Sequence, residues 1–86
     1  MPYIEKGRKE IFNKHLEGLM DSSHIVKGDL TYCIFKIGLE YMKSRDVNYQ
    51  NLSDCVSAMN DSANEFRRRF LDVYEDRKIL ENGDIE

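Results

Sequence analysis

Apolar residues recur with an alternating spacing of four and three through the second half of the chain. Seven positions keep this spacing without a break: Leu52, Val56, Met59, Ala63, Phe66, Phe70 and Val73. This pattern is typical of an amphipathic helix whose apolar seam is buried against a partner. Arg77 and Leu80 extend the same count, so we expect one long helix that runs from about residue 52 to about residue 80.

Two shorter helices are expected before the long one. Over residues 6–20, Phe12, Leu16 and Leu19 repeat at a spacing of four and three. Residues 30–44 carry apolar stripes on two sides, so this helix is expected to be the most central. Gly38 lies between the two stripes, at a cost of about 1 kcal/mol in helix propensity relative to Ala. We attribute it to the close approach of a neighbouring backbone.

The expected helix ends follow from residues that can satisfy free backbone groups. Asp29 and Asn51 are the predicted N-caps of the second and third helices, because their side-chain oxygens can accept hydrogen bonds from first-turn amides. Asp54 follows Asn51 by three positions, which is a variant of the capping box. The run of residues 82–84, Asn-Gly-Asp, predicts the end of the long helix. Residues 1–4 are expected to form a short extended arm.

These elements predict a single all-α domain over residues 1–86, a small bundle of two shorter helices and one long C-terminal helix. The seam from Leu52 to Val73 spans roughly 30 Å at a rise of about 1.5 Å per residue. Helices of about 15 residues cannot cover all of it. A chain of 86 residues also buries only a thin core. We therefore expect a homo-oligomer that forms through the long helix.

Composition narrows the classes of function. The net charge of −3 argues against a generally cationic nucleic-acid-binding protein but is compatible with a local basic patch. Residues 72–86 hold six acidic and two basic side chains, which favours a solvated acidic tail. No apolar run approaches the roughly 20 residues of a membrane span, and the first residues do not resemble a secretion signal. The cytoplasm is the expected location, with Cys33 and Cys55 as reduced, buried side chains.

Signals for catalysis and for cofactors are absent from the sequence. There is no nucleophile elbow, no phosphate-binding loop and no dinucleotide-binding glycine pattern. A metal site is not expected, because the possible ligands lack the paired spacing of metal sites: His15, His24, Cys33 and Cys55. We expect a protein that is not an enzyme and that carries no cofactor.

The run from Arg67 to Arg69 admits two interpretations. The favoured one is a salt-bridged helix surface, since Glu65 precedes Arg69 by four positions and Asp72 follows Arg68 by four. The other is an anion site in which arginine grips phosphate and tyrosine stacks on a ring, doubled across a two-fold axis. Asn60, Arg67 and Tyr74 recur at heptad spacing, which places them on one strip beside the seam. The candidate ligand-binding residues are Asn60, Arg67, Arg68, Arg69 and Tyr74.

Several short motifs resemble a family of short uncharacterised proteins from bacteriophages and mobile elements. They are MPYI at residues 1–4, GDLTY at 28–32, EFxRR at 65–69 and YEDxKIxENGD at 74–84. The chain differs from the family pattern at Arg67, where an aromatic residue is more usual, so the resemblance places more weight on Arg68 and Arg69. The resemblance implies a phage-encoded accessory protein in the host cytoplasm, and it carries over no catalytic residue.

The expected function is therefore non-enzymatic binding. The partner would be a host protein, or a nucleotide-like anionic signal that the protein sequesters. Two alternatives stay open: a nucleic-acid-associated protein that uses Arg67–Arg69, and a purely structural oligomer.

Overall fold

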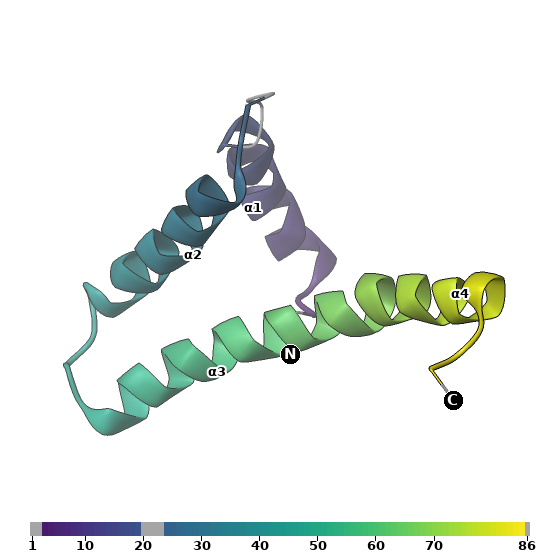
Figure 1. Ribbon diagram of the computed structural model, residues 1–86. Helices are drawn as coiled ribbons and strands as arrows, with labels where there is room; N and C mark the ends of the chain where they lie inside the picture. The colour runs from purple at the N-terminus through teal and green to yellow at the C-terminus, as the bar shows by residue number, and fades with distance from the viewer. Residues whose placement is uncertain (1–2, 20–23, 86) are drawn as a thin grey trace. The chain divides into compact units, whose positions relative to one another are not determined.

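The chain folds entirely into helices over the residues that the structure describes, 3–19 and 24–85, in a computed structural model. The elements in order are α1 (Lys6–Leu19), α2 (Lys27–Met42), α3 (Tyr49–Phe66), the π-helical turn η1 (Arg67–Leu71) and α4 (Asp72–Asn82). The last three join without a break into one helix of 34 residues, which Figure 1 shows as a continuous ribbon. The prediction of an all-α chain with two shorter helices and one long C-terminal helix is confirmed.

The described residues fall into two compact units, residues 3–55 and residues 56–85. The boundary between them lies inside α3, so the long helix contributes to both. The expected single domain over residues 1–86 stays a prediction.

In the first unit, α1 begins and ends close to the expected bounds of 6–20. The carbonyl oxygen of Glu5 accepts hydrogen bonds from the amides of Arg8 and Lys9, both at 3.1 Å. Tyr3 and Ile4 precede the helix without regular structure and are 45% and 42% exposed, as an N-terminal arm would be. The remaining arm residues, 1–2, and the predicted last residue of the helix, Met20, lie outside the described residues.

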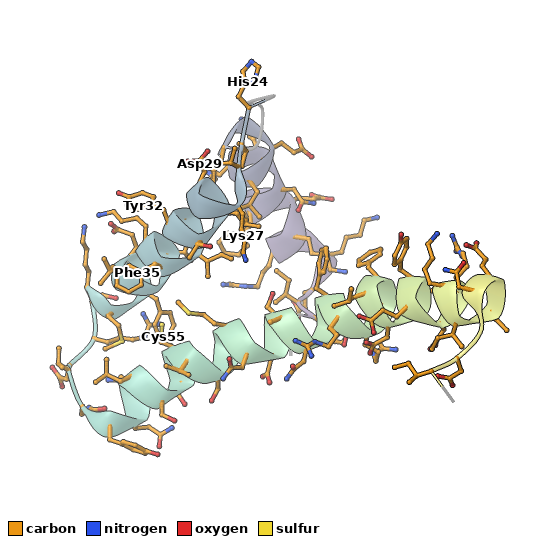
Figure 2. All side chains as sticks on the ribbon, viewed as in Figure 1. His24, Lys27, Asp29, Tyr32, Phe35 and Cys55 are labelled. Atoms are coloured by element: carbon orange, nitrogen blue, oxygen red, sulfur yellow. The ribbon has the colours of Figure 1, made fainter. Side chains whose placement is uncertain are left out.

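The second helix begins three residues earlier than the sequence predicts. Its N-cap is Val26, and Asp29 is the third helical residue rather than the cap. The Asp29 carboxylate reaches back and accepts a hydrogen bond from the backbone N–H of Val26 at 3.1 Å. Figure 2 shows Asp29 at the start of α2. The prediction that Asp29 is the N-cap is wrong, because a carboxylate in the first turn can satisfy a free amide from either position.

The long helix also begins earlier than predicted, at Tyr49. Its cap is Asn48, whose side-chain oxygen accepts a hydrogen bond from the N–H of Asn51 at 2.9 Å. Asn51 instead donates from its side-chain amide to the carbonyl of Asp46 at 2.9 Å. Asp54 accepts from the side chain of Gln50 at 2.7 Å, which is an i,i+4 pair on the helix surface. The predicted cap at Asn51 is therefore wrong by one helical turn.

Gly38 lies at a contact between α2 and α3 within the first unit. Among the described residues, it alone is buried. The thiol of Cys55 lies 3.8 Å from the Gly38 carbonyl oxygen, at hydrogen-bonding distance for sulfur. The neighbour seen at Gly38 is thus a side chain of α3, and the predicted approach of a neighbouring backbone stays a prediction. Cys33 and Cys55 are free thiols and are half-buried, less enclosed than the sequence predicts.

In the second unit, the long helix ends where the sequence predicts. Gly83 has a φ of +85°, a left-handed conformation that glycine adopts at little cost. Its N–H donates to the carbonyl of Ile79 at 2.8 Å and closes the last turn. The stop predicted over residues 82–84 is confirmed.

The cap assignment can be tested by alanine substitution. Asn48→Ala removes the side chain that satisfies a first-turn amide, so it should lower the free energy of unfolding by about 1 kcal/mol. Asn51→Ala, the matched control, removes one exposed side-chain hydrogen bond and should cost about half as much. Urea unfolding at one fixed protein concentration measures both. A larger loss for Asn51→Ala than for Asn48→Ala would contradict the assignment.

Candidate interaction surface

The second unit presents large apolar side chains to solvent on either side of the π-helical turn. We call this set the C-terminal apolar face. Its members and their exposed fractions are Val56 (56%), Phe66 (66%), Phe70 (60%), Leu71 (45%) and Val73 (49%). The rings of Phe66 and Phe70 lie against each other, with centroids 4.9 Å apart. Phe66 and Phe70 therefore form one exposed apolar patch, and the other members are exposed apolar residues of the same unit.

Such a patch is costly to leave in water. Burial of apolar surface yields about 25 cal/mol per Å², and a fully buried Phe or Val side chain gains about 1.5–3 kcal/mol relative to an exposed one. Contiguous exposed apolar patches on soluble proteins mark interaction sites. The C-terminal apolar face is therefore the first candidate for a functional surface on this chain.

The π-helical turn changes the register of the long helix. The N–H of Asp72 bonds to the carbonyl of Arg67, a span of five residues. A π turn adds about one residue to a helical turn, which rotates the following helix by roughly 100°. The heptad count that joins Asn60 and Arg67 to Tyr74 does not hold across this turn. The predicted single strip of these three residues, and the predicted unbroken apolar seam, are therefore corrected.

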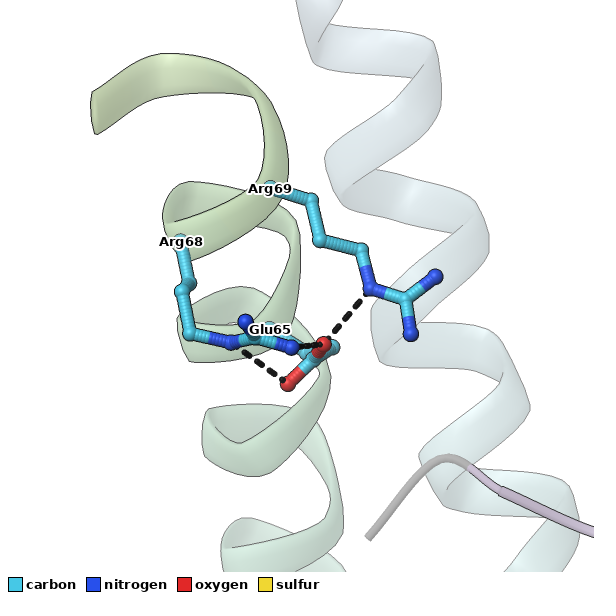
Figure 3. A network of polar contacts seen from close by, with 3 residues as sticks. All are labelled: Glu65, Arg68 and Arg69. Atoms are coloured by element: carbon cyan, nitrogen blue, oxygen red, sulfur yellow. Dashed lines mark hydrogen bonds and ion pairs between the residues drawn. The ribbon is translucent and has the colours of Figure 1, made fainter. Parts of the chain in front are cut away.

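Arg68 and Arg69 share one acceptor at this turn. The carboxylate of Glu65 accepts from the Arg69 Nε at 2.6 Å and from the Arg68 Nε at 3.4 Å, and Arg68 Nη2 also bonds to it (Figure 3). The predicted pair between Glu65 and Arg69 is confirmed, and Arg68 joins the same carboxylate. The side chains of Arg68 and Arg69 are 66% and 50% exposed, against 19% for Glu65.

This arrangement leaves the turn locally positive. Arg67, the third arginine, is also exposed, and three guanidinium groups accompany one carboxylate between residues 65 and 69. A guanidinium has five donors, and arginine commonly binds carboxylates and phosphates through them. The geometry is therefore compatible with both interpretations of the arginine run, a paired surface and an anion site.

Tyr74 lies on the α4 side of the π turn and has a different neighbour. The ammonium of Lys78 lies 5.5 Å from the centroid of its ring, a cation–π contact. Tyr74 is 54% exposed and Asn60 is exposed. Of the five candidate residues, the structure shows a shared contact for Arg68 and Arg69, through Glu65. No spacing rule for apolar residues would have revealed the π turn that separates Tyr74 from the others.

The sequence predicts neither a metal site nor a membrane span. Over residues 3–19 and 24–85, no three His, Cys, Asp or Glu side chains gather in a way that could hold a metal ion. None of the helices in this part of the chain combines the length and the apolar character needed to cross a membrane.

The family described as Domain of unknown function (DUF6899) matches residues 1–85, so the chain belongs to that family. No curated protein and no solved structure matches the chain.

The arginine pair allows a direct test of the two interpretations. If Arg68 and Arg69 serve only as a paired surface, Arg68→Ala and Arg69→Ala should each change the free energy of unfolding by less than about 1 kcal/mol, because exposed ion pairs contribute little. Urea unfolding measures this change. Isothermal titration with nucleotides measures binding, which should be undetectable in the unaltered protein and in both variants. Anion binding that both variants weaken while remaining folded would contradict the paired-surface interpretation.

Proposed function

We propose that this chain is a non-enzymatic binding protein that works as a homo-oligomer assembled through its long helix. The observation that carries the proposal is the exposure of Phe66 and Phe70, at 66% and 60%. Two adjacent phenylalanine rings are strong drivers of association, because aromatic side chains dominate the energetics of interfaces. A second helix laid along this face would remove both from water.

The lengths of the helices support the same proposal. The 34-residue helix is about 51 Å long, whereas α1 with 14 residues and α2 with 16 residues are about 21 and 24 Å long. Packed side by side on it, the two shorter helices would cover about half of the long helix. The other half then needs a partner from outside the chain.

The biological setting is proposed from the resemblance to proteins of bacteriophages and mobile elements. It rests on the motifs at residues 1–4 and 74–84. We propose an accessory protein that acts in the host cytoplasm on a host factor, with the oligomer as its working form. A size and helical content of this kind suit a protein that acts by occupying a surface rather than by chemistry.

A second candidate function is the capture of a nucleotide-like anion, and the observation that favours it is the locally positive π turn. Arg67, Arg68 and Arg69 are exposed on adjacent positions and outnumber Glu65. Phosphate groups accept bidentate hydrogen bonds from arginine, whether they belong to a nucleotide or to a nucleic acid. A thermal-shift screen with cyclic and linear nucleotides, and with duplex DNA as competitor, distinguishes the two, since a ligand of the folded state raises the unfolding temperature.

Assembly is tested by sedimentation equilibrium at tens of micromolar. We expect a dimer or a larger species for the unaltered chain. Phe66→Ala should weaken association strongly, because truncation of a buried phenylalanine costs about 3–5 kcal/mol. Its effect on the dilute monomer should be small, since Phe66 is largely exposed in the single chain.

The matched control is Val47→Ala. Val47 is 80% exposed, lies between α2 and α3 and is not a member of the C-terminal apolar face, so its truncation should leave association unchanged. A single species of 10.2 kDa at all concentrations of the unaltered chain would contradict the proposed assembly.

A further inference from the structure

We infer that two copies of this chain pair through their long helices in antiparallel orientation, with the arginine turn of each copy facing the acidic turn of the other. The arginine turn is Arg67–Arg69, and the acidic turn is the preceding segment Asp61–Glu65. The inference rests on the proposed oligomer and adds its orientation, its register and the charged groups that set them.

The distribution of charge along the long helix carries the inference. α3 holds three acidic side chains, Asp54, Asp61 and Glu65, and no basic one. The π turn that follows holds three arginines and no acid. The long helix therefore changes from acidic to basic near Glu65 and Phe66. This point lies within one turn of the midpoint of the helix, which runs from Tyr49 to Asn82.

A parallel pair in register would bring each charged turn onto its own copy. The three arginines would face three arginines, and like charges directly opposed are destabilising. An antiparallel pair with its two-fold axis near Glu65 and Phe66 reverses this. The arginine turn then lies opposite the acidic turn of the second copy, and the two-fold axis makes the contact twice.

Phe66 lies next to the same axis and is 66% exposed in the single chain, so its ring would meet the second copy near the centre of the pair. Val56 precedes Phe66 by ten residues, and Val73 follows it by seven, beyond the π turn. In an antiparallel pair, Val73 of one copy would lie at the level of Ala58 of the other.

A charge exchange tests the orientation. Arg67→Glu places a carboxylate opposite Asp61 of the second copy, and Asp61→Arg places a guanidinium opposite the arginine turn. Each variant should raise the dissociation constant of the dimer about five- to tenfold at low salt. Sedimentation equilibrium measures this constant. The double variant Asp61→Arg/Arg67→Glu should return it to within about threefold of the original value, since opposite charges face each other again.

Positions 61 and 67 are too far apart along one helix to contact each other, so rescue reports a contact between copies. A parallel dimer would show no rescue, which would overturn the antiparallel inference and leave the proposed oligomer standing. A monomeric unaltered chain, with its apolar face covered by its own shorter helices, would overturn both.

A distance measurement gives a second readout that does not depend on charge. Spin labels on Val73→Cys, with Cys33 and Cys55 replaced by alanine, should lie about 20–25 Å apart in an antiparallel pair, from the helical rise of about 1.5 Å per residue. In a parallel pair the two labels would be about 10 Å apart, the spacing of packed helices. The shorter distance would overturn the inference.

Discussion

The length of the C-terminal helix limits how much of its apolar surface the rest of the chain can cover. A helix of 34 residues with an apolar face needs a covering surface about as long as itself, and the two shorter helices are each less than half that length. Phe66 and Phe70 show the consequence, because both rings touch each other and remain largely exposed. The hydrophobic effect then favours association over an isolated chain. The proposed assembly and the proposed orientation of the partner both rest on this shortage of cover.

The π turn modifies how that face is presented. It falls on Arg67–Leu71, where the most basic segment of the chain meets exposed aromatic rings. The added residue rotates α4 relative to α3, so the apolar residues before and after it do not share one straight stripe. It also gathers Arg68 and Arg69 around Glu65. In the proposed dimer, a partner helix would meet apolar side chains and charged side chains at the same place, and the charges would discriminate between orientations more than they add to affinity.

The sequence predicted the helices well and their beginnings less well. Apolar spacing predicted all three helices. Gly83 predicted the end of the last one, because helices often end at a residue in the left-handed conformation and that residue is usually glycine. The caps were misplaced because Asn48 and Asn51, three residues apart, are both good caps, and only hydrogen-bond geometry separates them. The sequence predicted the i,i+4 pair of Glu65 with Arg69 but not the bond from Arg68 to the same carboxylate. The sequence did not predict the π turn, because apolar spacing does not indicate where a backbone hydrogen bond spans five residues instead of four.

Amide hydrogen exchange at two protein concentrations tests whether the C-terminal apolar face is buried between two copies. One concentration lies below the dissociation constant of the dimer and the other above it. In the long helix, the amides from Phe66 to Val73 should exchange more slowly at the higher concentration, because association stabilises this segment. The amides of α1 should change less and serve as the internal reference. Exchange at Phe66–Val73 that is the same at both concentrations would contradict the account.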